Sequence, residues 1–199
     1  GKAPITHVHG MTIGELGLFF ANMQDISHVV NVVKMEGWKR NMLWEDTGLF
    51  WIPPSPNLPT PTSAIVYPVT VFVEATTVSE GRGTCTPFEV FGAPFYDPNL
   101  LADALNTPKG GACNSETKEW DSHAELRDDS GVCSCYRAES YNPTFGQYNG
   151  TVCHGVQVAA DRSSVINTSP FQAGMAILRV LIDQGKDKFV WDGSWMNHP

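Results

Sequence analysis

Short runs of β-branched and aromatic residues stand out from the polar positions along the first half of the chain. Residues 69–73 (VTVFV) have the composition of a buried strand, and residues 28–35 (HVVNVVKM) are a second strand candidate. The first run turns polar and ends in the glycine-flanked residues 81–83. A buried strand that opens into such a loop is a common position for a site in α/β proteins. The ordinary alternative is a plain strand–loop connection with surface glutamates at Glu74 and Glu80.

Helical patterns surround these runs. Thr12 and Glu15 match a capping box, in which each side chain bonds the backbone N–H of the other. Thr60 is expected to cap a short helix that Pro68 ends after Tyr67. The first of these helices is expected to bury one apolar face, consisting of Ile13, Leu16, Gly17 and Phe20.

The second half of the chain has a different pattern. Asp97-Pro98 predicts a helix start, and a last helix is expected over residues 170–184 before Gly185. Residues 107–134 are rich in Gly, Asp, Ser and Glu and have no hydrophobic period, so they form a predicted insertion. The expected strands are residues 87–95, 135–140 and 152–159.

The change of pattern near Thr84 predicts a domain boundary. Before it, helices alternate with strands as in a parallel α/β sheet, but the strands are too few for a complete doubly wound sheet. We therefore expect residues 1–84 to be the last part of an α/β domain that continues in a longer protein. Residues 85–199 are expected to form a smaller α+β domain with a Cys-rich insertion at about 107–134.

Composition excludes several classes of partner. The 199 residues are 42% hydrophobic, which is enough for a sizeable core. The net charge of −8 lacks the basic footprint of a nucleic-acid-binding protein. No apolar run reaches the ~18–20 residues of a membrane-spanning helix. The first ten residues do not resemble a signal peptide, so either the protein is cytoplasmic or its N-terminus has been processed.

The cysteines favour an oxidising compartment. Three of the five lie between Cys113 and Cys135, and the sequons at Asn149 and Asn167 also favour a secreted or periplasmic protein. Reduced cysteines in the cytoplasm are the alternative. A metal site at residues 133–135 is not expected, because no second ligand pair has suitable spacing.

Long motifs resemble the exo-β-N-acetylmuramidase family, which was formerly a domain of unknown function. The similarity covers nearly the whole chain apart from roughly residues 107–134. The motifs that carry it, in the family's order, are HGMTIGEL (9–16), MEGWKR (35–40), TGLFWIPPSPNLPT (47–60), AIVYPVTVFVEATTVSEGRGT (64–84), PFEVFGAPF (87–95) and YNPTFGQYNGTVCHGVQV (141–158). This chain departs from the family at Val8, Ala75 and His154.

The resemblance implies a fold and a substrate. It implies that residues 1–84 complete a Rossmann-like domain whose earlier half, with a catalytic glutamate, is not in this chain. The site would lie in a cleft between that domain and the smaller C-terminal domain. The implied activity is hydrolysis that releases N-acetylmuramic acid from non-reducing ends of peptidoglycan fragments, without a metal or nucleotide cofactor. The alternatives are a non-catalytic, carbohydrate-binding or structural relative and, more distantly, an esterase or amidase that lacks a visible nucleophile.

Glycoside hydrolysis usually needs two carboxyl groups, about 5–5.5 Å apart for retention or about 6.5–9.5 Å for inversion. If residues 74–80 were extended at ~3.3 Å per residue, Glu74 and Glu80 would lie about 20 Å apart. They could act together only if residues 75–79 turn back sharply, so a partner carboxylate from elsewhere is the simpler expectation. Glu80 is the preferred catalytic residue, because Arg82 beside it could hold an anionic lactyl group. The structural alternative is a Glu80–Arg82 ion pair that only fastens the loop.

Several other residues are candidates for binding the sugar. The proline-rich loop that contains Trp51 and Asn57 suits stacking against a sugar, and a hydrophobic cover over the core is an equal alternative. His9 precedes a helix N-terminus, where an anion could bind, but it could equally be a hydrogen-bonded core histidine. Tyr67 and Tyr141 could line the pocket or serve packing.

Overall fold

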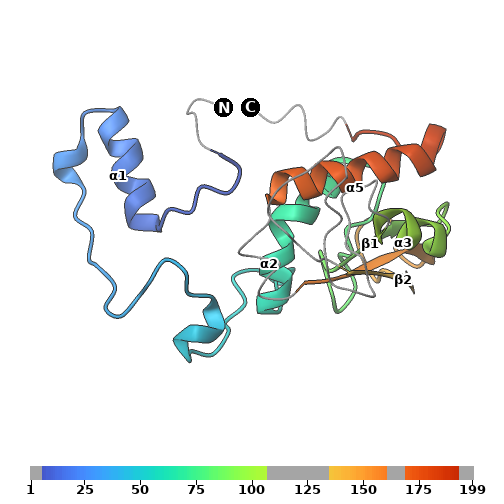
Figure 1. The fold of residues 1–199 in the computed structure, drawn as a ribbon, viewed down its shortest axis with the longest axis horizontal. Helices are drawn as coiled ribbons and strands as arrows, with labels where there is room; N and C mark the ends of the chain where they lie inside the picture. Colours follow the sequence, from blue (N-terminus) through green and yellow to red (C-terminus); the bar gives the residue numbers. More distant parts are fainter. Residues whose placement is uncertain (1–5, 107–134, 161–168, 193–199) are drawn as a thin grey trace. The chain divides into compact units, whose positions relative to one another are not determined.

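The computed structural model of the chain describes residues 6–106, 135–160 and 169–192 (Figure 1). The chain divides into two compact units, residues 1–49 and residues 50–199, which are described separately below. The expected Cys-rich insertion at 107–134 lies outside the described residues. The division of the chain into domains at about Thr84 stays a prediction.

The first unit contains one α-helix and two short 3₁₀ helices. These are α1 (Ile13–Met23), η1 (Ser27–Val29) and η2 (Trp44–Thr47). The capping box of α1 is confirmed: the N–H of Thr12 donates to Glu15 Oε2 at 2.7 Å, and the N–H of Glu15 donates to Thr12 Oγ1 at 3.2 Å. The expected apolar face is not buried, because Ala21 is the one buried residue in α1 and Ile13 is 90% exposed.

The strand expected at residues 28–35 is wrong. The run begins inside η1 and then continues as chain without a ladder partner. A β-branched run becomes a strand only when a neighbouring strand takes up its backbone groups, and none is paired with it in the described residues.

The second unit contains a three-stranded sheet. Its strands are β1 (Val90–Ala93), β2 (Cys135–Tyr141) and β3 (Cys153–Ala159), in the order β1-β3-β2 with both pairs antiparallel. Val156 lies opposite Phe91 on one side and opposite Ala138 on the other. The three strands predicted for this half are confirmed, although β1 is shorter than expected.

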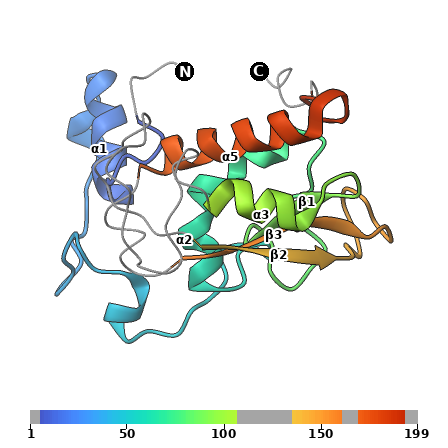
Figure 2. The same ribbon diagram turned by 45° about the vertical axis from the view of Figure 1, so that its right-hand side comes forward.

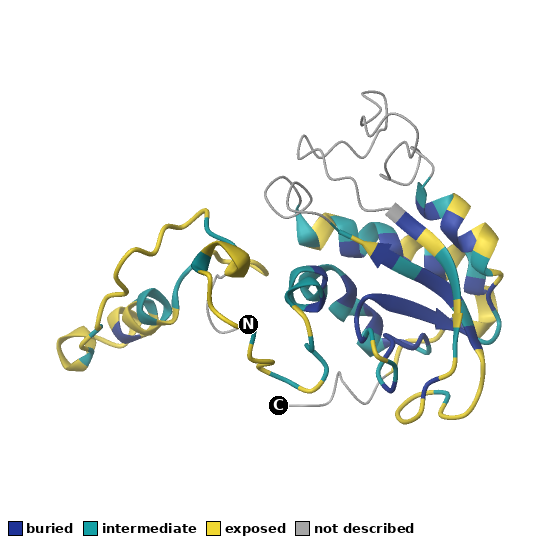
Figure 3. Cartoon of the chain, turned by 90° about the horizontal axis from the view of Figure 1, so that it is seen from below, coloured by how far each residue is buried: buried dark blue, intermediate teal, exposed yellow. Residues whose placement is uncertain are grey.

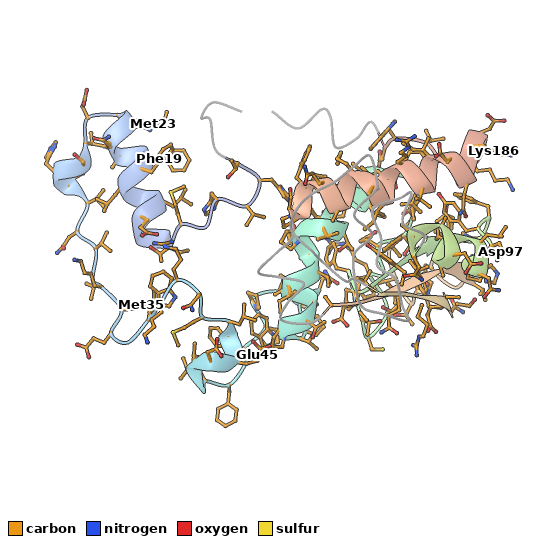
Figure 4. All side chains as sticks on the ribbon, in the orientation of Figure 1. Phe19, Met23, Met35, Glu45, Asp97 and Lys186 are labelled. Carbon is orange, nitrogen blue, oxygen red and sulfur yellow. The ribbon has the colours of Figure 1, made fainter. Side chains whose placement is uncertain are left out.

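Helices pack around this sheet. They are α2 (Pro61–Thr70), η3 (Val71–Ala75), α3 (Pro98–Asn106), α5 (Pro170–Gly185) and η5 (Lys186–Lys188). Helix α3 packs on β2 and β3, and α5 contacts both α2 and α3 (Figure 2). The predicted starts of α3 and α5 are confirmed: Asp97 Oδ1 accepts the N–H of Asn99 at 2.9 Å, and Ser169 caps α5. Asp97 and Lys186 mark the start of α3 and the end of α5 in Figure 4.

The strand expected at residues 69–73 is wrong, because this run is helical. The capping pair Thr60–Ser63 and Pro61 start α2, which runs through Pro68 to Thr70 and continues directly into η3. Helix α2 packs against α5, so tertiary burial of the β-branched side chains decides the conformation and overrides their strand propensity. The fold is therefore mixed α/β with an antiparallel sheet, and the described residues contain no parallel sheet.

The core of the second unit lies between the sheet and the helices, and all four residues of β1 are buried, the class drawn in dark blue in Figure 3. Its fully buried large side chains include Phe88, Phe91, Leu101, Ile177, Leu181 and Val156. None of the described helices is both long enough and apolar enough to cross a membrane.

Candidate active site

Glu74, Glu80 and Arg82 meet in one cluster. Arg82 Nε lies 2.7 Å from Glu80 Oε1 in an ion pair, and Arg82 Nη2 donates to Glu74 Oε1. The two carboxylates therefore share one guanidinium. The expected separation of about 20 Å does not apply, because it assumed an extended strand and the chain turns back between the two glutamates.

Local hydrogen bonds explain this reversal. Residues 71–75 form η3, and the helix closes through Thr76, whose Oγ1 donates to the carbonyl of Val73 at 2.8 Å and accepts the N–H of Val78 at 3.0 Å. Val73 and Val78 are completely buried. Their burial anchors both sides of the turn, so Glu74 and Glu80 project from neighbouring points.

Glycine completes the loop on the far side of Glu80. Gly83 has a φ of +83°, and a Cβ there would lie 2.6 Å from the carbonyl oxygen of Phe145. The carbonyl of Gly83 accepts the backbone N–H of Thr144 at 2.9 Å. A side chain at this position would push apart the loop that carries Arg82 and the loop at 143–150.

Burial and neighbouring charges act in opposite directions on the ionisable groups of the cluster. Burial raises the pKa of the Glu80 carboxyl, and the nearby Glu74 charge raises it further, whereas the Glu80 backbone N–H and Arg82 oppose that rise. Burial also opposes the charge on Arg82, but its bonds with Glu74 and Glu80 outweigh this and raise the pKa of the guanidinium. With both glutamates ionised, the three side chains carry a net charge of −1. Proton uptake at Glu80 would leave the cluster neutral.

Tyr67 and Phe88 border the cluster. The Tyr67 ring packs edge-on against Phe88 with centroids 4.7 Å apart, and burial followed by the charge of Glu74 raises the pKa of its hydroxyl. The Arg82 Cζ atom lies 5.1 Å from the centroid of the Phe88 ring. Tyr67 thus lies beside the cluster, and its contact with a sugar stays a prediction. Phe88 was not predicted, because the sequence shows it only as one apolar residue of a strand candidate.

Tyr141 supports the backbone of the site loop. Its hydroxyl donates to the carbonyl of Ser79 at 3.1 Å and is 3.4 Å from the carbonyl of Gly92. Burial raises the pKa of this hydroxyl strongly. The structure therefore gives Tyr141 a bond to the residue that precedes Glu80, and its contact with a sugar stays a prediction.

The remaining predicted binding residues are held by local bonds. Trp51 Nε1–H donates to the carbonyl of Leu58 at 3.3 Å, and the N–H of Asn57 donates to Ser55 Oγ at 3.2 Å, both inside the proline-rich loop. His9 lies in the first unit, is exposed, and accepts the N–H of Met11 on Nδ1 at 3.1 Å. Their roles in sugar binding stay predictions.

A segment near the C-terminus also fixes the site, and sequence reasoning missed it. The N–H of Thr77 donates to the carbonyl of Val190 at 2.9 Å, and the N–H of Asp192 donates to the carbonyl of Ala75 at 2.8 Å. Trp191 lies opposite Thr76 in an isolated bridge. No local signal in the sequence connects these residues, which are more than a hundred positions apart.

The described side chains offer no grouping of three His, Cys, Asp or Glu residues that could hold a metal ion. Cys153 is buried, and burial raises the pKa of its thiol to about 11. Cys85 is exposed and forms no disulfide within the described part of the chain.

Two family descriptions match the chain. "Exo-beta-N-acetylmuramidase NamZ, N-terminal" matches residues 1–62, and "Exo-beta-N-acetylmuramidase NamZ, C-terminal" matches residues 65–198. A curated relative from Bacillus subtilis (strain 168), "Peptidoglycan beta-N-acetylmuramidase NamZ", is 39% identical over 190 residues. That match covers 95% of this chain and 40% of the relative, so the chain spans less than half of the relative's length.

Two solved structures of DUF1343 family proteins from Bacteroides fragilis NCTC 9343 are similar in fold. The first is 28% identical with a TM-score of 0.71, and the match covers 92% of this chain and 43% of that one. The second is 23% identical with a TM-score of 0.50, and the match covers 91% of this chain and 41% of that one. The second likeness concerns the fold alone.

Proposed function

Because the chain belongs to the exo-β-N-acetylmuramidase NamZ family, we propose that it provides part of the active site of a peptidoglycan glycosidase. The reaction is hydrolysis that releases N-acetylmuramic acid from the non-reducing ends of peptidoglycan fragments. The B. subtilis relative, named as a peptidoglycan β-N-acetylmuramidase, supports this choice of substrate. The single observation that carries the proposal is the pair of carboxylates, Glu74 and Glu80, on one guanidinium.

In this proposal Glu80 is the general acid. Its side chain is only 10% exposed, and burial raises the pKa of its carboxyl, which favours the protonated form that donates to a leaving-group oxygen. Glu74 remains paired with Arg82 and supplies negative charge beside an oxocarbenium-like transition state. If the family's N-terminal part supplies a further carboxylate, that carboxylate supplies the negative charge beside the transition state, and Glu74 is a positioning residue instead.

Arg82 acts in this proposal as a positioning residue. Both Nε and Nη2 are engaged by carboxylates, so a lactyl carboxylate would have to use Nη1 or displace one of them. Arg82 thus holds the two acids at fixed points, and the anionic group of the substrate binds elsewhere or through the exposed edge of the guanidinium.

The proposal also includes the domain architecture and the cellular location of the protein. Residues 1–84 are proposed to complete a Rossmann-like domain, and the site is proposed to face the smaller C-terminal domain. A secreted or periplasmic location suits a peptidoglycan substrate, and the exposed sequon residue Asn149 is compatible with it.

The second candidate is a non-catalytic relative that binds peptidoglycan sugars. It is favoured by one observation: Arg82 pairs with both Glu74 and Glu80, an arrangement that could serve only to fasten the loop. An enzyme and a binding protein differ in turnover, since both would bind the sugar.

The test measures release of N-acetylmuramic acid from a chromogenic muramic acid glycoside by the protein and by its Glu74→Gln and Glu80→Gln variants. We expect turnover by the unsubstituted protein and a loss of at least about 10²-fold for Glu80→Gln, typical of removing a general acid. Sugar binding in calorimetry without any turnover would contradict the enzyme proposal. Full activity of both variants would instead contradict the site assignment.

A further inference from the structure

Phe88 lies beneath the ion cluster at a position that no comparison assigns. Its side chain is 1% exposed, and its ring lies 5.1 Å from Arg82 Cζ and packs edge-on against Tyr67 at 4.7 Å. The Arg82 cation thus lies over the face of the Phe88 ring. The edges of that guanidinium, which carry the N–H groups, point to Glu74 and Glu80.

The backbone at Phe88 has an unusual conformation. Its φ is +65°, in the left-handed region that bulky residues rarely adopt. The N–H of Phe88 donates to the carbonyl of Glu80 at 2.7 Å, so the same residue contacts the loop of the acid through its backbone and the cation through its ring. Strained conformations persist where the surroundings over-determine them, and they concentrate at functional sites.

The neighbouring residue fixes this conformation from the other side. Glu89 is 8% exposed, accepts the hydroxyl of Thr60 on Oε1 at 2.8 Å, and its carbonyl accepts the N–H of Val158 at 2.7 Å. The turn at Phe88 is therefore tied both to the start of α2 and to β3. A ring held so firmly is a rigid support for a flexible arginine side chain.

We propose that Phe88 is a positioning residue that holds Arg82 between Glu74 and Glu80 by stacking under its guanidinium. A cation over an aromatic face is attracted by the ring's quadrupole, and this attraction grows when water is excluded. Without the ring, the arginine side chain regains its rotamer freedom and its contact with the buried acid weakens. The proposal rests on the proposed function only in naming Glu80 as the acid.

The consequence is a measurable change at Glu80. Arg82 lowers the pKa of the Glu80 carboxyl through its charge and its hydrogen bond, against the effect of burial. Loss of the stacking therefore raises the pKa of Glu80 further. We expect Phe88→Leu to increase the proton affinity of Glu80 by roughly threefold or more, the size expected from a lost cation–π contact.

The chain offers a matched control in Phe91. It is also fully buried, lies in β1, and packs edge-on against Tyr136 at 6.3 Å. Phe91→Leu removes the same ring from the same core, and leaves the contact with Arg82 in place. Phe88→Tyr keeps a ring under the guanidinium and is expected to retain the titration of the unsubstituted protein.

The experiment titrates the Glu80 side-chain carboxyl carbon by NMR in the chain and in these three variants. The Arg82 side-chain protons are expected to show an upfield ring-current shift in the unsubstituted protein and in Phe91→Leu. In Phe88→Leu that ring-current shift is expected to vanish, and the pKa of Glu80 is expected to rise.

Equal titration of Glu80 in the two leucine variants would overturn the proposal and leave Phe88 as a packing residue. Absence of the ring-current shift in the unsubstituted protein would also overturn it, even if Phe88→Leu does not fold. None of these readouts needs turnover. If the titration of Glu80 changes in Phe88→Leu but the protein shows no glycosidase activity, the result would therefore count against the proposed function alone.

Discussion

The titration of Glu80 links the cluster to stability at the scale of a single residue. Burial raises the folded-state pKa of this carboxyl above its ordinary value. The folded protein then binds the proton more tightly than the unfolded chain. Glu80 therefore lowers the free energy of unfolding as the pH rises from its pKa in the unfolded chain through its pKa in the folded protein. The cost is present in full above the folded pKa and absent below the unfolded pKa.

Glu80→Gln is therefore expected to gain stability relative to the unsubstituted protein as the pH rises from 4 to 8. Chemical denaturation at several pH values measures the difference in unfolding free energy. A difference that stays constant with pH, or one that falls, would show that the pKa of Glu80 is not raised.

Gly83 allows a second prediction at the same scale. Gly83 and Gly150 share a left-handed φ, of +83° and +74°, but a Cβ has open space only at Gly150. Both alanine variants introduce backbone strain, so the difference between their losses of unfolding free energy reports the clash of the Cβ at position 83 with the backbone at Phe145. Gly83→Ala is expected to cost on the order of 1–3 kcal/mol more than Gly150→Ala in thermal or chemical unfolding. Equal losses of unfolding free energy in the two variants would mean that the loop that carries Arg82 separates easily from the loop at 143–150.

At the scale of an element, α2 carries the residues that lead into the site. Thr60 caps this helix by accepting the N–H of Ser63 at 3.0 Å, and its hydroxyl also donates to the buried carboxylate of Glu89 at 2.8 Å. Thr60→Ala is expected to cost about 0.5–2 kcal/mol for the cap and roughly 1 kcal/mol more for the donor lost by Glu89. Thr60→Ser keeps both bonds and serves as the control. Unfolding midpoints that match for both variants would contradict this double role.

The elements also show how far the sequence predicts this fold. The capping box at Thr12, the helix start at Asp97 and the three strands of the sheet are local patterns, and the structure confirms them. The helical state of residues 69–73 was missed because β-branched residues suit a buried helix face as well as a strand, and packing on α5 decides between the two.

The candidate site was predictable only in part for a related reason. The motif that ends at Arg82 contains the three residues that meet in the cluster, and the Glu80–Arg82 ion pair of the structural alternative is observed. The convergence of Glu74 and Glu80 depends on contacts between Thr77 and Val190, which no spacing along the sequence reveals. The position of Phe88 under Arg82 depends on other tertiary contacts, the bonds of Glu89 with Thr60 and Val158.

At the scale of the whole molecule, the two units differ in how much they bury. Ala21 is the one buried residue described in the first unit, where Phe19 and Met23 project from α1 (Figure 4), and the apolar core belongs to the second unit. Helices gain most of their stability from a buried face. Helix α1 exposes most of its apolar residues, whereas α3, of similar length, buries Leu101, Ala102 and Leu105.

Amide hydrogen exchange of the chain tests this contrast. The amides of α1 are expected to exchange at least about tenfold faster than those of α3, because local opening of α1 exposes little new apolar surface. Equal protection of the two helices would mean that another surface covers α1 in solution.

The central claim is that Glu80, held by Arg82, is the acid of a peptidoglycan glycosidase, and one comparison of turnover tests it most directly. Glu139 offers a matched control, because it also pairs with an arginine, Arg137, at 3.0 Å, but on the exposed surface of β2. The measurement is kcat/KM for release of N-acetylmuramic acid by Glu80→Gln and by Glu139→Gln. The account predicts a loss of about 10²-fold or more for the first and an unchanged value for the second, and equal values for the two variants would contradict it.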